Sequence, residues 1–198
     1  MKEYIPGRIA ALQAELKKLE LDAALIYDRE NLIYFAGVTD LEGGVLCVPA
    51  EGEAELFCIW LEAGHMHEAT GLKTTGFYFP AENQSIRAAR WLAGLGLAKP
   101  RVGFTRYFIS LKDYQCLREA CPDMVVGDIA TVCYRLRSVK CPEEIDRIRR
   151  AGKALEAGMS AAVASVRAGM PECEVLAEAE YAMGKAGSQG SPFRMQVL

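Results

Sequence analysis

A proline followed by two glutamates, at residues 142–144, divides this chain into two parts of different character. Proline suits the first turn of a helix because its missing N–H would be unbonded there, and glutamates oppose the positive helix end. Behind them, apolar and small residues recur at alternating spacings of three and four, the period of one helical face. The members of this stripe are Ile145, Ile148, Gly152, Leu155, Met159, Ala162 and Val166. The spacing predicts one long amphipathic helix.

The part of the chain before this helix alternates between two kinds of apolar segment. Some repeat at helical spacing, and others are short, apolar or β-branched runs typical of strands. Such alternation predicts an α/β fold, a mixed sheet flanked by helices. Helices are predicted near residues 5–19, 31–37, 60–69, 85–95, 110–120 and 129–136, and strands at 21–27, 45–48, 54–59, 72–79, 101–104 and 124–126, the second and third strands forming a hairpin.

After the long helix, the sequence predicts a turn at 167–171, a helix at 172–185 and a strand at 193–198. We therefore expect an α/β domain over residues 1–136, a linker at 137–141, and the incomplete start of a second domain over 142–198. A strand at the very end of a chain has no later partner, and we expect the chain to stop inside its second domain. The apolar stripe then needs cover, either from another chain or from the helix at 172–185.

Composition limits the partners and the compartment. The net charge is −3, which disfavours general binding to nucleic acid or to anionic lipid. No apolar run approaches the length of a membrane span, and the first residues open an amphipathic helix rather than a signal peptide. The seven cysteines are odd in number, scattered and mostly set in apolar strings. Buried free thiols in a reducing cytoplasm are the simplest interpretation.

The sequence has two histidines, His65 and His67, and they are weak candidates for metal ligands. On a strand, residues two apart share one side and could bind a metal together with Glu62 and Glu68. On a helix the two imidazoles would point roughly 200° apart. Solvated or interface histidines are the alternative, and we expect no metal site in this chain.

Other signatures of chemistry are missing from the sequence. The glycine pairs at 43–44 and 94–96 match neither GxGxxG nor GxxxxGK[ST], which disfavours a nucleotide site. There is no GxSxG elbow, and no cysteine has an identifiable histidine partner. From the residues alone, the sequence predicts a fold and no reaction.

Three segments resemble signatures of one family, the creatinase/prolidase metallopeptidases. Asn31-Leu-Ile-Tyr-Phe-Ala-Gly37 is similar to the family's N-I-x-Y-L-T-G motif in its N-terminal domain. The junction from Arg137 to Ala151 resembles R-x-x-K-s-x-x-E-i-x-x-i-r-x-A, and Arg167-Ala-Gly-Met-Pro-Glu172 resembles the turn that opens the second helix of the catalytic domain. The three lie in the family's order and together span nearly the whole chain.

The resemblance implies a two-domain enzyme. Its N-terminal domain would be a ribonuclease-H-like α/β fold that assists homodimerisation, followed by the first helices of a pita-bread catalytic domain. In the family, the catalytic domain binds two divalent metal ions (Mn, Co or Zn) through two Asp, one His and two Glu. The usual reaction hydrolyses the peptide bond before proline, and a metal-bridging hydroxide attacks the carbonyl.

The sequence departs from the family pattern at its functional positions. No Asp, His or Glu in it matches a metal-ligand position, since those ligands would follow residue 198, and no catalytic residue is carried over. Cys141 stands where the family commonly has a Ser or Thr helix cap. Thr39, Asp40 and Glu42 follow the first signature, where family members can contact substrate across the dimer. They are candidate substrate-flanking residues by position, with an ordinary surface loop as the alternative.

We therefore expect the N-terminal, dimerising and substrate-flanking portion of a cytoplasmic, metal-dependent Xaa-Pro peptidase that is inactive by itself. Its partners would be a second copy and the peptide substrate of the parent enzyme, with no nucleic acid and no membrane. One alternative is a non-catalytic binding or dimerisation module of the same family. Another is creatinase-like amidinohydrolase or lyase chemistry on the same fold.

Overall fold

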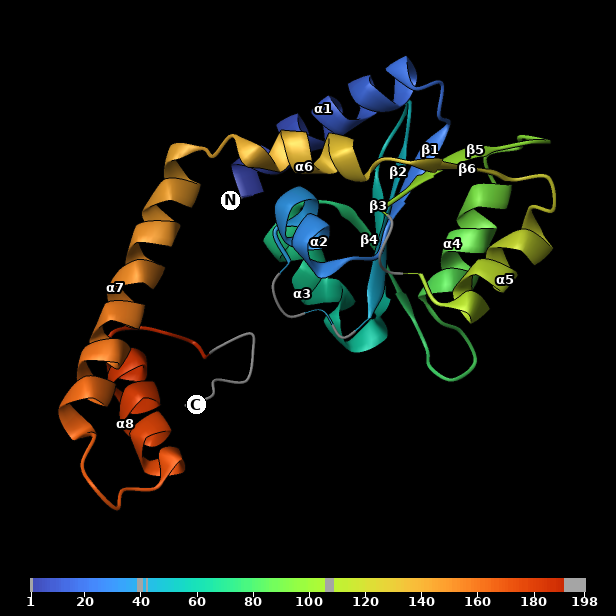
Figure 1. Cartoon of the computed structure of the whole chain (residues 1–198). Coiled ribbons are helices and arrows are strands. Elements are labelled where there is room, and N and C mark those ends of the chain that lie inside the picture. Colours follow the sequence, from blue (N-terminus) through green and yellow to red (C-terminus); the bar gives the residue numbers. More distant parts are fainter. Residues whose placement is uncertain (1, 39–40, 42, 106–108, 191–198) are drawn as a thin grey trace. The chain divides into compact units, whose positions relative to one another are not determined.

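The computed structural model describes residues 2–38, 41, 43–105 and 109–190 of the chain (Figure 1). The chain divides into two compact units, Met1–Val139 and Lys140–Leu198, and each is described by itself. The last helix of the first unit ends at Ser138, and the first helix of the second unit begins at Pro142. The strand predicted at 193–198 lies outside the described residues.

A mixed six-stranded sheet forms the centre of the first unit, in the order β4-β3-β2-β1-β5-β6. The central strand β1 is antiparallel to β2 and parallel to β5, while β2 and β3 form the expected antiparallel hairpin. The outer pairs β3–β4 and β5–β6 are parallel. The strands are β1 (Ala23–Ile26), β2 (Gly44–Pro49), β3 (Glu55–Ile59), β4 (Lys73–Phe77), β5 (Arg101–Phe104) and β6 (Val125–Asp128).

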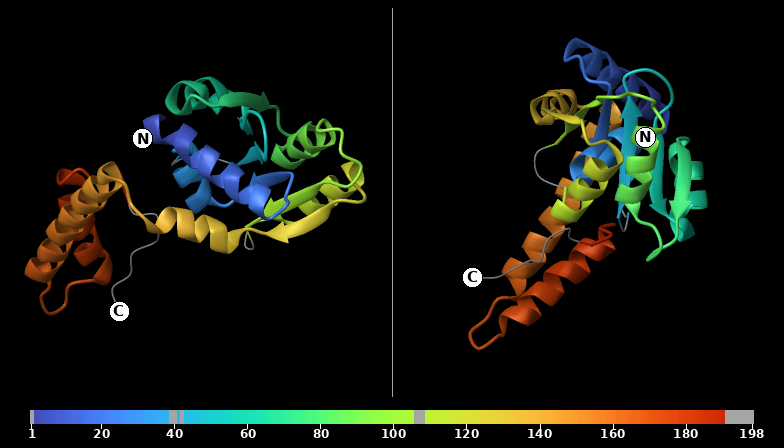
Figure 2. Two further views of the ribbon diagram at one scale, coloured as in Figure 1. Left: turned by 90° about the horizontal axis from the view of Figure 1, so that it is seen from above. Right: turned by 90° about the vertical axis from the view of Figure 1, so that its right-hand side faces the viewer.

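Helices cover both faces of this sheet (Figures 1 and 2). One face packs against α1 (Ile5–Lys18), α2 (Arg29–Ala36), α3 (Trp60–Thr70) and α6 (Ala130–Ser138). The other face packs against α4 (Gln84–Ala93) and α5 (Leu111–Ala120). A short 3-10 turn, Lys2–Tyr4, precedes α1. The mixed sheet flanked by helices confirms the predicted α/β class.

Strand β1 is apolar throughout because helices cover it on both faces of the sheet. Ala24 and Ile26 enter the core under α1 and α2, whereas Ala23 and Leu25 enter the core under α4 and α5. Alternate side chains of a strand point to opposite faces, so a strand that is covered on both sides needs apolar residues at every position. The prediction of an interior strand here is confirmed.

The second unit contains two helices packed side by side, α7 (Pro142–Ser165) and α8 (Glu172–Lys185). Pro142 occupies the first turn of α7, as expected, and the N–H of Cys141 donates to the Glu144 carboxylate at 2.9 Å. Small residues make the contact between the helices, because Ala154 and Gly158 are buried on α7 and Val175 and Ala179 on α8.

The apolar stripe on α7 is not the face that meets α8. Ile148, Leu155 and Met159 are each more than half exposed, so the expectation that residues 172–185 cover the stripe is wrong. At 3.6 residues per turn, Ala154 and Gly158 lie roughly 100° around the helix from the stripe. Small side chains there let α8 approach closely, which the larger stripe residues would prevent. Cover of the stripe by another chain stays a prediction.

Among the described residues, no helix is both long enough and apolar enough to cross a bilayer.

Candidate functional site

The first family-like signature begins at a hydrogen-bonded cap on α2. Asp28 is the N-cap residue, and its Oδ2 accepts from the side-chain Nδ2 of Asn31 at 2.6 Å and from the Asn31 main-chain N–H at 3.4 Å. The other carboxylate oxygen accepts from the hydroxyl of Thr105, just beyond β5. Both Asp28 and Asn31 are buried. Asp28 therefore links the signature asparagine at the start of α2 to the ends of β1 and β5.

The remaining signature positions also fix α2 in place. The Tyr34 hydroxyl donates to the carbonyl of Leu136 at 2.8 Å, and Arg8 donates to the Tyr34 carbonyl at 2.7 Å while its guanidinium lies 4.2 Å from the Tyr34 ring centroid. Phe35 is fully buried. Gly37 closes the helix at φ 70°, a left-handed conformation that glycine adopts without strain. These residues bind neighbouring helices and have no catalytic geometry.

The predicted substrate-flanking residues Thr39, Asp40 and Glu42 lie outside the described residues, and the structure does not test that prediction. Their described neighbours Val38, Leu41 and Gly43 line the wall of a cavity.

The two histidines lie on helix α3, not on a strand. Residues two apart on a helix point roughly 200° apart, so His65 and His67 do not share a side. The Nδ1 of His67 lies 2.8 Å from the Leu72 carbonyl. Within the described residues, no group of three or more His, Cys, Asp or Glu side chains could hold a metal ion.

A cavity of about 480 Å³ opens at the carboxyl ends of β1 and β5, which are parallel neighbours. The chain leaves β1 into α2 on one face of the sheet, and it continues from β5 to α5 on the other face. Adjacent parallel strands whose connections diverge in this way leave a crevice at the sheet edge, where α/β proteins commonly bind ligands. The volume falls within the range of small-molecule sites.

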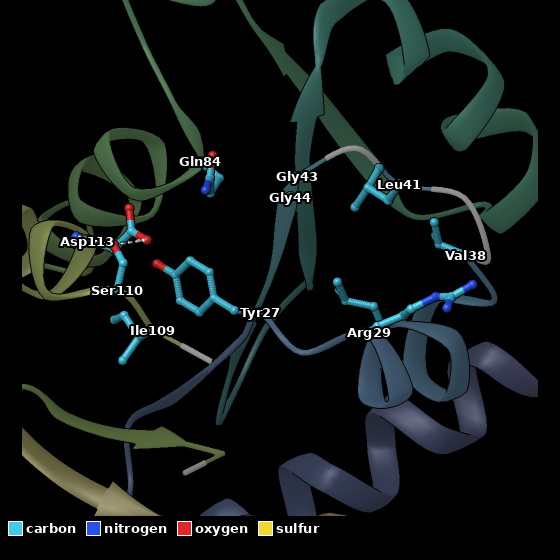
Figure 3. A pocket seen from close by; sticks show the side chains of 11 residues that line it. Tyr27, Arg29, Val38, Leu41, Gly43, Gly44, Gln84, Ile109, Ser110 and Asp113 are labelled. Atoms are coloured by element: carbon cyan, nitrogen blue, oxygen red, sulfur yellow. Dashed lines mark hydrogen bonds between the residues drawn. The ribbon is translucent and has the colours of Figure 1, made fainter. Parts of the chain in front are cut away.

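The walls of this cavity differ in chemistry (Figure 3). Tyr27, Gln84 and Asp113 present polar groups on one side, and Arg29 at the start of α2 lies on the other side. Ser110 caps α5 by accepting from the Asp113 N–H at 3.1 Å, and its hydroxyl donates to Asp113 Oδ2 at 2.6 Å. The other lining residues are Leu32, Val38, Leu41, Gly43, Gly44 and Ile109.

Tyr27 provides a hydroxyl that keeps its proton. Burial raises the pKa of Tyr27 well above its ordinary value of 10.0, and a hydrogen bond from Ser85 only partly offsets this. Because Ser85 Oγ donates to the Tyr27 oxygen at 3.4 Å, the phenolic hydrogen can be donated elsewhere. Figure 3 shows the hydroxyl directed toward Ser110 and Asp113.

Three buried cysteines of the first unit are poor nucleophiles. All seven cysteines are free thiols, but burial raises the pKa of Cys58 to about 11 and of Cys133 to about 12, and it also raises that of Cys47. The thiolate is the reactive species, so these three stay inert at neutral pH.

Sequence reasoning did not find the cavity. The sequence predicts only a helix at 110–120 around Ser110 and Asp113, and the Gly43–Gly44 pair was weighed only as a phosphate loop. Tyr27, Arg29 and Gln84 come from separate elements and have no common motif. The cavity could have been inferred only from the topology, because polar residues follow two predicted strands that become neighbours in the sheet.

Comparison with known proteins identifies the family. The sequence model of the creatinase/prolidase N-terminal domain matches residues 8–139, two thirds of the chain. The chain belongs to the creatinase/prolidase N-terminal domain family. The resemblance based on the three signatures is thereby confirmed.

Relatives and solved structures extend the likeness beyond the matched family domain. A putative dipeptidase, YkvY of Bacillus subtilis, is 28% identical over 97% of this chain and 54% of its own length. The ectoine hydrolase of Halomonas elongata is 26% identical over 94% of this chain and 50% of its own. The crystal structure of the prolidase from Pyrococcus horikoshii has the same fold, with a TM-score of 0.80 at 22% identity, covering 92% of this chain and 50% of that one. The chain spans about half the length of the curated relatives it matches.

Proposed function

We propose that this chain is the N-terminal portion of a metal-dependent Xaa-Pro peptidase of the aminopeptidase P or prolidase type. The observation that carries the proposal is the match of the family's N-terminal domain model to residues 8–139. The similarity continues through α7 and α8 in a relative named as a putative dipeptidase and in the crystal structure of a prolidase. In this role the α/β unit flanks the substrate and helps two copies associate, while the bond cleavage belongs to the rest of the parent protein.

The described residues do not fit a two-metal centre. Such a centre needs clustered carboxylates and imidazoles, and no group of three or more possible ligands occurs among the residues that the structure describes. His65 and His67 diverge on α3. We therefore propose no catalytic step through a metal held by this chain, and we expect the chain alone to be inactive.

A peptidase assay tests this proposal. The 198-residue chain is incubated with an Xaa-Pro dipeptide and Mn²⁺, and release of free proline is measured. We expect no turnover above the metal-only control. Metal-dependent release of proline by the purified chain, abolished by a chelator, would contradict the proposal.

A second candidate is hydrolysis of a non-peptide substrate by the parent protein. It is supported by the ectoine hydrolase, which is nearly as similar to this chain as the putative dipeptidase is. The N-terminal domain would then flank a different substrate on the same fold. Parent protein that releases proline from dipeptides and leaves ectoine intact would exclude this alternative.

A non-catalytic module of the family is the third candidate, and a parent protein that turns over neither substrate would favour it.

An exposed aromatic surface supports the proposed homodimer. Trp60 and Tyr78 stack with ring centroids 5.1 Å apart, next to the edge strand β4, and both are about half exposed or more. Leu61 and Phe79 nearby are each more than 70% exposed. Large contiguous apolar groups on a surface commonly mark protein interfaces.

Sedimentation equilibrium tests the dimer. We expect the chain to sediment as a dimer, and the double substitution Leu61→Ser with Phe79→Ser to shift it toward the monomer. The matched control is Leu111→Ser, an equally exposed leucine on α5, which should leave the dimer intact. Equal association of both variants would contradict a dimer through this surface.

The free thiols support a reducing, cytoplasmic location, which stays a proposal.

A further inference from the structure

The polar side chains of the cavity at the carboxyl ends of β1 and β5 gather on one side. Figure 3 shows Gln84 and Asp113 near the Tyr27 hydroxyl, while Val38 and Leu41 lie on the opposite side. A ligand that fills this cavity of about 480 Å³ therefore needs a polar head and an apolar tail. The charge of the polar side decides which head it accepts.

That polar side carries a negative charge. Among the described residues that line the cavity, Asp113 is the only acidic one and Arg29 the only basic one. Arg29 is exposed, and its side chain is directed away from Asp113 (Figure 3). Burial raises the pKa of Tyr27 and keeps its hydroxyl neutral. The N-terminal end of α5 contributes a partial positive charge of roughly half a unit, which is smaller than the full charge of the carboxylate. The polar side therefore attracts a cation.

The carboxylate of Asp113 is held in one orientation and has an oxygen to spare. Its Oδ2 accepts from the Ser110 hydroxyl at 2.6 Å, and its main-chain N–H donates to the same hydroxyl oxygen at 3.1 Å. Within the described part of the chain, no hydrogen bond reaches Oδ1. A charge-assisted bond from a cation to an oriented carboxylate is among the stronger hydrogen bonds. The side-chain oxygen of Gln84, on the same side of the cavity, can accept a second N–H of that cation.

These groups suit an organic cation better than a metal ion. A divalent metal ion in a protein needs four or more ligands, several of them from side chains. No group of three or more His, Cys, Asp or Glu side chains that could supply them occurs among the described residues. An ammonium group needs only hydrogen-bond acceptors, and the hydrocarbon tail that it carries can cover the apolar wall of Leu32, Val38 and Leu41.

We propose that this cavity binds an aliphatic primary amine that has no carboxyl group. Its ammonium group donates to Asp113 Oδ1 and to the side-chain oxygen of Gln84, and its tail packs against the apolar wall. A free amino acid fits less well, because its carboxylate is attached to the same carbon as the ammonium and would lie beside Asp113. The inference is independent of the proposed peptidase function, because it depends only on the first unit and holds whether or not the parent protein cleaves peptides.

The test is an NMR titration of the ¹⁵N-labelled 198-residue chain at pH 7 with 3-methylbutylamine and three matched compounds. The first, 3-methylbutan-1-ol, has a hydroxyl in place of the ammonium; L-leucine adds a carboxylate to the same carbon; methylamine lacks the tail. We expect saturable shifts from 3-methylbutylamine at the amides of Gly43, Gly44 and Gln84, and at least tenfold weaker binding of each matched compound. Binding of any of the three as tight as that of 3-methylbutylamine, or no saturable shift at these amides, would overturn the proposal.

A charge-neutralising variant isolates the ammonium contact. Asp113→Asn keeps a side-chain oxygen for the Ser110 hydroxyl, and it should weaken 3-methylbutylamine binding about tenfold while leaving 3-methylbutan-1-ol binding unchanged. Glu119→Gln, the same charge change at an exposed position of α5, serves as the control and should alter neither. If Asp113→Asn weakened both compounds equally, or neither, Asp113 would not contact the ammonium and the proposal would be wrong. Should that variant fail to fold, the four compounds on the unmodified chain still decide the outcome.

Discussion

The hydroxyl of Tyr34 donates to the main-chain carbonyl of Leu136 at 2.8 Å, joining α2 to α6 across 102 residues of sequence. Tyr34 belongs to the signature that relates this chain to its family, and Leu136 lies just before the junction signature. The first signature is therefore bound to the end of α6, and it is a packing motif rather than a set of catalytic groups.

Removing the Tyr34 hydroxyl should destabilise the first unit. Tyr34→Phe leaves the Leu136 carbonyl without its donor, at an expected cost of about 1 kcal/mol in the free energy of unfolding. The measurement is urea unfolding followed by tryptophan fluorescence, since both tryptophans, Trp60 and Trp91, lie in the first unit. Tyr134→Phe, on the exposed side of α6, is the control. Equal stability of the two variants would show that the bond contributes nothing.

Replacing the signature asparagine by aspartate should destabilise the fold in a pH-dependent way. Asn31→Asp sets a second carboxylate against Asp28, where the amide now donates at 2.6 Å, and should cost at least about 2 kcal/mol near neutral pH. The repulsion raises the carboxyl pKa values in the folded state, so stability should recover as the pH falls and one proton is bound.

The control for this charge effect is Asn83→Asp. Asn83 also precedes a helix, and its Oδ1 accepts from the N–H groups of Ser85 and Ile86. Aspartate caps a helix about as well as asparagine, so stability near pH 7 should change little. A pH-independent loss at Asn31 would point to a steric cause instead.

The buried thiol of Cys133 should make the fold less stable in alkali. Its pKa rises from the ordinary 9.0 to about 12, mainly because of burial. Between these values the folded state holds a proton that the unfolded state has lost, so the free energy of unfolding falls with pH by up to about 1.4 kcal/mol per unit. Cys133→Ala should flatten the pH dependence, whereas Cys173→Ala, at an exposed position, should not. Identical slopes would contradict the assignment.

Two glycines of α7 should respond oppositely to alanine. A Cβ on Gly158 would lie 2.4 Å from Met183 Cγ and 3.2 Å from the Ala179 carbonyl oxygen, whereas one on Gly152 meets nothing within 4 Å. Gly158→Ala should therefore separate α7 from α8, and Gly152→Ala should stabilise the helix by up to about 1 kcal/mol through helix propensity. Hydrogen exchange of the α7 amides measures both. Faster exchange in Gly152→Ala, or unchanged exchange in Gly158→Ala, would contradict this packing.

The sequence predicted elements whose signals are local. Pro142 and the two glutamates after it mark the start of α7, and the all-apolar run in β1 indicates a strand buried on both faces. The face of a helix that packs against another helix cannot be read from local sequence. The large apolar residues of the α7 stripe suggested that they form the contact, but the residues of α7 that are buried against α8 are Ala154 and Gly158. The cavity was missed for the same reason, because Tyr27 and Asp113 become neighbours only when β1 and β5 pair.

The most direct test of the account is the reading frame that follows the Leu198 codon in the genomic DNA. We predict an open frame that encodes two Asp, one His and two Glu at the spacing of the family's two-metal centre, which would make this chain the substrate-flanking half of a metallopeptidase. An open frame without those five ligands, or a stop codon directly after Leu198, would contradict the proposed function.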